Sequence, residues 1–114
     1  MQTINRSVAI IRPKQPFIDW ANQLPDAESK TSLEDLKDDC LAILIPNYED
    51  NDEANGYIDE MAEDIFEEEL FSWCTHKPWF PKNRTKKMFW DWFEVEFHSI
   101  VIDQCRNAIK KEEL

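Results

Sequence analysis

The stretch M-F-W-D-W-F-E-V-E-F-H-S-I-V-I-D at residues 88–103 carries the densest aromatic cluster of the chain and its strongest strand pattern. From residue 94 the side chains alternate in character, which predicts a strand over 94–102 with one apolar face. The opposite face is mixed, with Glu94, Glu96, His98, Ile100 and Ile102. Just upstream, residues 86–93 have the aromatic spacing of a short helix that Thr85 can cap. Periodicity leaves open whether 90–93 is helix or strand.

The chain before this stretch alternates short apolar runs with helical patterns. Apolar runs at 8–11 and 40–45, each followed closely by proline, predict two strands that are buried on both faces of the sheet. Between them, residues 16–24 have the spacing of an amphipathic helix that starts at a proline. Thr31 and Glu34 then match a capping box, which predicts a second, shorter helix.

The longest helical pattern runs from about residue 53 to residue 74, with apolar residues on one stripe and acids on the other. A weaker amphipathic pattern predicts a terminal helix over 103–111. Strands and helices in this order favour an α+β fold, a two- or three-layer sandwich with a small sheet of about three strands and helices between them. Because 114 residues suit one hydrophobic core, we expect a single globular domain over 1–114.

Negative charge is concentrated in one part of the chain. The net charge is −11, and residues 49–69, the acidic segment, contain eleven acids and no Lys or Arg. The remaining residues hold thirteen acids and thirteen bases, so they are neutral together. A segment of this kind repels a phosphate backbone, which argues against nucleic acid as a partner.

Bases and aromatic residues are interleaved in residues 76–92, the basic-aromatic segment. Three interpretations are open: internal packing with ion pairs to the acidic segment, a site for a protein partner, or a platform for a single-stranded nucleic acid. The predicted binding residues come from both segments. They are Trp79, Phe80, Lys82, Arg84, Lys86 and Trp90 from the basic-aromatic segment, and Glu63, Asp64, Glu67 and Glu68 from the acidic one.

The weak catalytic candidates are Glu94, Glu96 and His98, which alternate along the predicted strand. Their side chains would project from one face at spacings of about 7 Å, where two carboxylates and an imidazole could bind a metal or exchange protons. The alternative interpretation is the polar face of an exposed strand. No other sequence feature supplies a clear partner for them, so we predict no cofactor and no resident metal.

Cysteine usage and hydropathy favour a cytoplasmic protein. Cys40, Cys74 and Cys105 are odd in number and widely spaced, which matches neither a disulfide framework nor a zinc site. The N-terminal apolar run is too short for a signal peptide, and no run approaches the roughly 20 apolar residues of a membrane span. We therefore expect no membrane partner.

These observations predict a non-enzymatic binding or regulatory protein that acts through protein–protein contacts. Charge segregation and abundant aromatic residues both suit a protein interface. The alternative is a small metal-dependent or acid–base enzyme that uses Glu94, Glu96 and His98. A third hypothesis is a homodimer formed through aromatic surface, because 14 aromatic residues exceed what a core of this size must hold.

Overall fold

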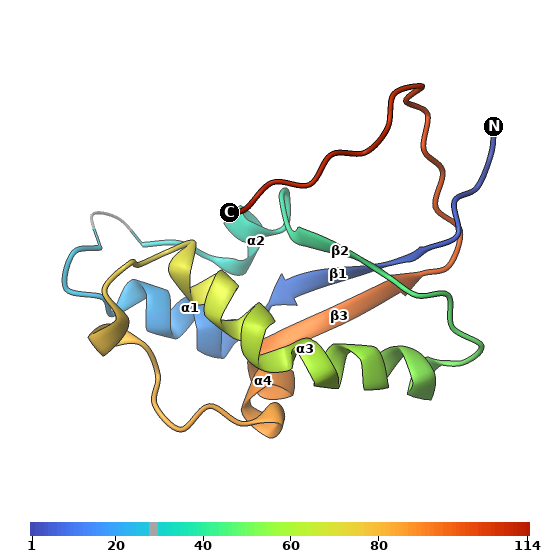
Figure 1. Ribbon diagram of the computed structural model, residues 1–114. Coiled ribbons are helices and arrows are strands. Elements are labelled where there is room, and N and C mark those ends of the chain that lie inside the picture. Colours follow the sequence, from blue (N-terminus) through green and yellow to red (C-terminus); the bar gives the residue numbers. More distant parts are fainter. Residues whose placement is uncertain (28–29) are drawn as a thin grey trace.

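The computed structural model describes residues 1–27 and 30–114, and it contains a three-stranded antiparallel sheet with helices packed against it (Figure 1). The strands are β1 (Ser7–Pro13), β2 (Leu41–Ile45) and β3 (Phe93–His98). Their order in the sheet is β2-β1-β3, so the first strand of the chain lies in the centre. The predicted α+β class with a sheet of about three strands is confirmed.

Three of the helices cover one face of this sheet. They are α1 (Gln15–Asn22), α3 (Asn51–Phe71) and α4 (Lys86–Trp92), all on the same side in Figure 1. A shorter helix, α2 (Leu33–Leu36), lies near one end of the sheet, and a 3-10 turn, η1 (Lys77–Trp79), precedes α4. Within the described residues, no helix combines the length and the apolar character that crossing a bilayer requires.

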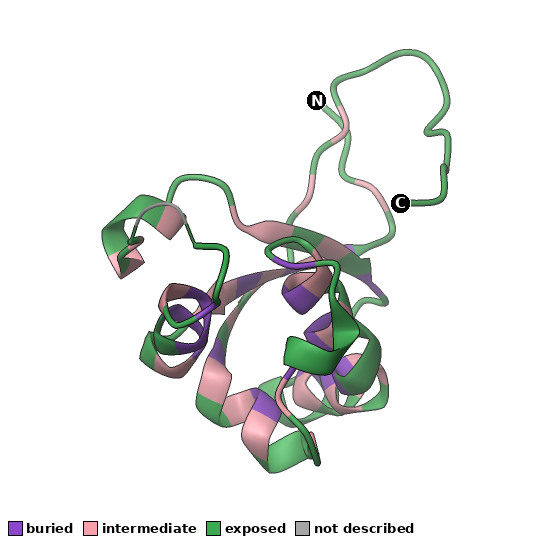
Figure 2. Ribbon diagram, turned by 90° about the vertical axis from the view of Figure 1, so that its left-hand side faces the viewer, coloured by how far each residue is buried: buried purple, intermediate pink, exposed green. Residues whose placement is uncertain are grey.

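The hydrophobic core fills the space between the sheet and these three helices. Figure 2 shows the buried positions gathered there, while both chain ends are exposed. Phe66 of α3 lies at its centre, with its ring centroid 5.3 Å from those of Trp92 and Phe93 and 6.4 Å from that of Phe89. Phe17 of α1 completes the cluster at 5.4 Å from Phe93.

The other face of the sheet is open, and here the sequence prediction was wrong. The strands at 8–11 and 40–45 were expected to be buried on both faces, but burial alternates along them. Ala9 and Ile11 face the helices and are fully buried, whereas Ala42 and Leu44 are exposed. Continuous apolar runs hid this alternation, because an apolar side chain looks the same in the sequence whichever face it occupies.

The helix caps match the sequence prediction, except that the cap of α2 lies one residue later than predicted. Thr85 caps α4 as predicted, and its hydroxyl accepts a hydrogen bond from the Met88 amide. The capping box of α2 uses Ser32 and Asp35, one position after the predicted Thr31 and Glu34. Thr31 is engaged elsewhere, because its amide and carbonyl both bond the Asn22 side chain.

Element boundaries also differ in the second half of the chain. The acidic helix α3 begins at Asn51, two residues earlier than predicted, because the Asp50 carboxylate accepts from the Glu53 amide. Residues 90–92 are helical and Phe93 opens β3, which resolves the ambiguity between helix and strand. The strand pairing ends at His98, and beyond it Thr3 and Ile102 form an isolated bridge.

The predicted terminal helix over 103–111 is absent. Residues 103–114 have no regular structure, and Ile109 is exposed. Short helices gain most of their stability from packing an apolar face against the rest of a protein, and this segment buries none. Its weak periodicity therefore has no consequence for the fold.

Candidate interaction surfaces

The acidic segment forms the outward face of α3. Ile58, Ile65, Phe66 and Leu70 are buried on the inner side of the helix, which holds it against the sheet and α4. The acids on the other side are directed to solvent, and the predicted binding residues Glu63, Asp64 and Glu68 are all exposed. Burial of the apolar stripe thus fixes a row of carboxylates that would repel one another in an isolated helix.

Little of this negative charge is neutralised inside the chain. Glu67 lies 3.8 Å from the ammonium of Lys77, a contact between two partly exposed side chains. Among residues 1–27 and 30–114, no cation comes within 4 Å of the carboxylates of Glu63, Asp64 or Glu68. In the described residues, ion pairing between the acidic and basic-aromatic segments, which is part of the first of the three interpretations, is therefore limited to the single pair Glu67–Lys77.

One acid on α3 has a different environment. Glu69 is half-buried, and burial raises the pKa of its carboxyl from 4.5 to about 7. It borders a hollow of about 690 Å³ between the last turns of α3 and the start of β2, together with Leu41 and Phe71. Asp39 and Glu68 line the same hollow, so its charged side chains are all acidic.

The aromatic residues of the basic-aromatic segment contribute mainly to packing. Phe80 is buried, with its ring centroid 5.1 Å from that of Phe71 and 6.1 Å from that of Trp20. Trp90 is half-buried and donates its indole N–H to the Asp59 carboxylate at 2.7 Å. Trp79 is the most open of the predicted aromatic binding residues at 36% exposure, and its carbonyl accepts from the Trp20 indole.

Two of the five bases of this segment, Lys77 and Lys87, form exposed ion pairs with Glu67 and Asp91. The other three divide into one packed residue and two without an ion pair in the described part of the chain. Arg84 stacks between the rings of Phe66 and Phe80, with its guanidinium carbon about 6 Å from each centroid, and bonds the Pro81 carbonyl. Lys82 and Lys86 are exposed, and neither forms an ion pair within the described residues.

The acidic and basic-aromatic segments meet at a hollow of about 210 Å³ between α3 and the start of α4. Glu63 and Phe66 contribute one wall, and Arg84 and Lys86 contribute the other. The structure thus brings predicted residues of both groups together, although their binding role stays a prediction.

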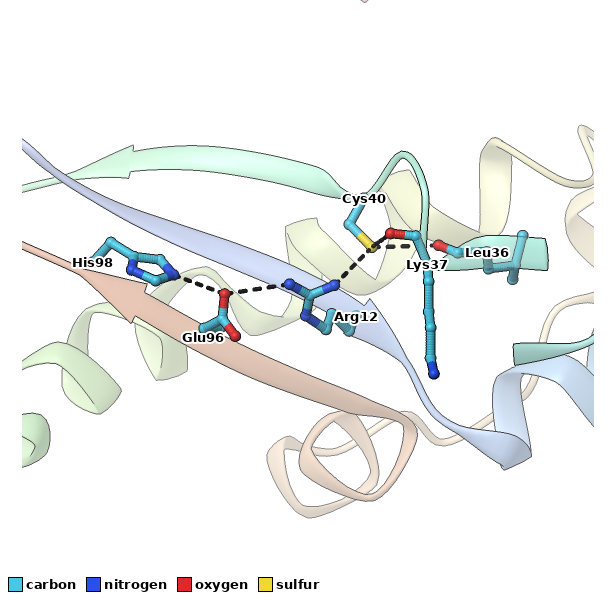
Figure 3. Close-up of polar contacts among 6 residues, drawn as sticks. All are labelled: Arg12, Leu36, Lys37, Cys40, Glu96 and His98. Atoms are coloured by element: carbon cyan, nitrogen blue, oxygen red, sulfur yellow. Dashed lines mark hydrogen bonds and ion pairs between the residues drawn. The ribbon is translucent and has the colours of Figure 1, made fainter. Parts of the chain in front are cut away.

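Glu96 and His98, two of the catalytic candidates, meet on the open face of the sheet (Figure 3). Nε2 of His98 lies 2.7 Å from Oε2 of Glu96, and the Arg12 guanidinium donates to the same oxygen at 3.2 Å. The hydrogen bonds from His98 and Arg12 hold the pKa of Glu96 below its usual value, and Glu96 raises that of Arg12. All three side chains are open to solvent, so water weakens these charge interactions.

Glu94 does not join this pair. It lines a separate hollow of about 270 Å³ with Arg12, Leu33 and Leu36, where α2 approaches the end of the open face. Within the described ranges, no group of three or more His, Cys, Asp or Glu side chains is arranged to hold a metal ion. Acid–base or metal chemistry at Glu94, Glu96 and His98 therefore stays a prediction without a completed site.

Sequence reasoning missed two members of this network. Arg12 links Glu96 to Cys40, whose sulfur lies 3.8 Å from the guanidinium and bonds the Leu36 carbonyl (Figure 3). Arg12 lies two positions after Ile10 and four after Val8 in β1. Because side chains alternate between the two faces along a strand, all three lie on the same, open face. The pairing of Arg12 with β3 required the strand order, which the sequence did not supply.

These features define a small two-layer α+β protein with one open sheet face and one acidic helix. A comparison with protein-family models finds no matching family, and comparisons with curated proteins and with solved structures find no match either.

Proposed function

We propose that this protein is a non-enzymatic regulatory protein that binds a basic surface of another protein through the acidic face of α3. The observation that carries the proposal is the exposed row Glu63, Asp64 and Glu68, which lacks ion-pair partners in the described part of the chain. Self-repulsion along such a row opposes folding, and Lys or Arg of a partner relieves it on binding.

The mechanism follows from the geometry of the helix. At 1.5 Å per residue, the 21 residues of α3 extend about 30 Å, so its carboxylates form a rigid linear array. Complementary charge of this kind accelerates encounter and fixes the orientation of the partner. A partner that binds nucleic acid fits the array, because the carboxylates would occupy the Lys and Arg side chains that otherwise neutralise phosphates.

The test reverses the charge at four acidic positions of α3 in one variant, in which Glu63, Asp64, Glu67 and Glu68 are all changed to Lys. A matched control makes the same change of charge at four exposed acids elsewhere, Asp26, Asp38, Glu112 and Glu113. Pulldown from native lysate is followed by affinity measurement with the purified partner at low and high salt.

We expect the wild type and the control to bind with an affinity that falls as salt rises, and the α3 variant to lose binding by about tenfold or more. Competition between the protein and nucleic acid for the same partner then tests the mechanism. Equal binding by the α3 variant and the wild type would remove the proposal, as would the recovery of no partner.

A further inference from the structure

The two edges of the sheet are built differently. β3 carries Glu94, Glu96 and His98 along its exposed face, and charged residues on an edge strand discourage pairing with another chain. β2, the opposite edge, has the sequence L-A-I-L-I, without a charged residue or proline. Within residues 1–27 and 30–114 it pairs only with β1, so its outer backbone groups have no strand beside them.

The core is also less covered at the β2 edge than at the centre of the sheet. Leu41 and Ile43 point to the helical layer but are only half-buried, whereas Ala9 and Ile11 beside them on β1 are fully buried. The hollow of about 690 Å³ adjoins Leu41 and continues to Phe71 at the end of α3. A partner placed against this edge would therefore cover apolar side chains as well as backbone.

We propose that β2 pairs antiparallel with β2 of a second copy of this chain, which joins two three-stranded sheets into one six-stranded sheet. A two-fold axis through Ile43 uses all five residues of the strand and keeps the helices of both copies on the same face. Leu41 of one copy then lies opposite Ile45 of the other, and Ala42 lies opposite Leu44.

The composition of the strand favours a second copy over an unrelated chain. Every cross-strand pair in this register is apolar, which is the arrangement that stabilises neighbouring strands. One position beyond β2, the same register sets Cys40 against Pro46, and the next sets Asp39 against Asn47 rather than against another acid. The pairing is thus self-complementary without bringing like charges into opposition.

The salt dependence of association distinguishes the β2 contact from partner binding at the acidic face of α3. The paired β2 residues are uncharged, but the hollow beside them is lined by Asp39, Glu68 and Glu69, and each copy carries a net charge of −11. Screening by salt therefore strengthens the association of two copies. Binding of a basic partner to α3 weakens with salt instead. Failure of one proposal therefore leaves the other intact.

The test is analytical ultracentrifugation of the full chain from about 1 µM to several hundred µM, a range that covers dissociation constants of about micromolar order. The first variant combines Ala42→Lys with Leu44→Lys, which sets Lys opposite Lys twice across the contact. The second combines Ala42→Glu with Leu44→Glu. Both pairs of substitutions replace exposed side chains on the open face, so they leave the core intact.

We expect the wild type to dimerise and each charged variant alone to dimerise about tenfold more weakly or not at all. An equimolar mixture of the two variants restores a dimer, because Lys of one chain then faces Glu of the other. The matched control is Val8→Lys, on the same open face but in β1, and it keeps the dimer.

A wild type that stays at the mass of one chain throughout this range would overturn the proposal. It would also fail if Val8→Lys alone abolished the dimer, since that result indicates stacking of open faces. Circular dichroism confirms that each variant is folded, and failure of the mixture to associate would count against the register.

Discussion

Glu69 combines a negative charge with a half-buried position on α3, and this makes its titration a property of the folded state. Burial raises the pKa of its carboxyl to about 7, whereas the unfolded chain titrates near 4.5. At a pH between these two pKa values, folding is therefore accompanied by uptake of a proton at Glu69. The stability that the neutral Glu69 carboxyl contributes is full below about pH 4.5 and is lost as the pH rises to about 7.

We predict that Glu69→Gln stabilises the protein at pH 8 and has little effect at pH 4.5. The expected gain at pH 8 is on the order of 1 kcal/mol, because partial exposure reduces the penalty for burying the charge. Urea denaturation at the two pH values measures it. Glu68→Gln, one position earlier and exposed, is the control for removing one negative charge from α3.

A gain that is equal for Glu69→Gln and Glu68→Gln would indicate general repulsion along the helix and not burial. An equal gain at both pH values would show that the carboxyl of Glu69 does not titrate between them.

Individual contacts were the part of the structure that sequence patterns predicted least well. The capping motif of α2 was found within one residue, but Ser32 takes the place of Thr31, whose backbone bonds the side chain of Asn22 at the end of α1. The Glu96–His98 pair followed from alternation along one strand. Its third member, Arg12, is 84 residues away in the chain, and local periodicity carries no information about such a contact.

At the scale of elements, the start of α3 depends on a single side chain. The Asp50 carboxylate accepts a hydrogen bond of 2.9 Å from the Glu53 amide, and two further acids, Asp52 and Glu53, occupy the first turn. We predict that Asp50→Ala lowers the free energy of unfolding by about 1 kcal/mol, the usual cost of losing such a cap.

The matched variant for this prediction is Asp50→Asn, which keeps an oxygen acceptor but removes the charge. Because Asn caps helices about as well as Asp, it should retain most of the stability. Thermal or urea denaturation measures both variants. If the two substitutions had the same effect, charge near the helix N-terminus, and not the cap, would be responsible.

Elements with strong local patterns were predicted well, and elements that depend on their neighbours were not. The alternation in β3 correctly separated Val95 and Phe97, toward the helices, from Glu94, Glu96 and His98 on the open face. The uniform apolar runs of β1 and β2 gave no such signal, so the open face was missed. The expected helix at 103–111 did not form, because the segment packs no apolar side against the rest of the protein.

At the scale of the whole molecule, the two proposed contacts use different layers. The acidic face belongs to α3 in the helical layer, and the dimer contact belongs to the edge of the sheet at β2. The aromatic surface that the sequence suggested for a homodimer is largely occupied by the core, as the packing of Phe80, Trp90 and Trp92 shows. The β2 edge replaces it as the proposed site of association.

The two layers depend on Phe66, which is 1% exposed and packs on Phe89, Trp92 and Phe93. We predict that Phe66→Ala lowers the free energy of unfolding by about 3–5 kcal/mol, through lost burial and the cavity left behind. That is a large fraction of the roughly 5–15 kcal/mol typical of a whole domain.

Removal of residues 104–114 is the contrasting change, because every side chain in that range is exposed. It should leave the urea midpoint nearly unchanged, whereas Phe66→Ala should shift it strongly at similar cooperativity. Both acidic-face and β2 contacts require α3 to stay docked on the sheet, so Phe66→Ala should weaken them together. Loss of stability on truncation, or a mild effect of Phe66→Ala, would contradict a core centred on this residue.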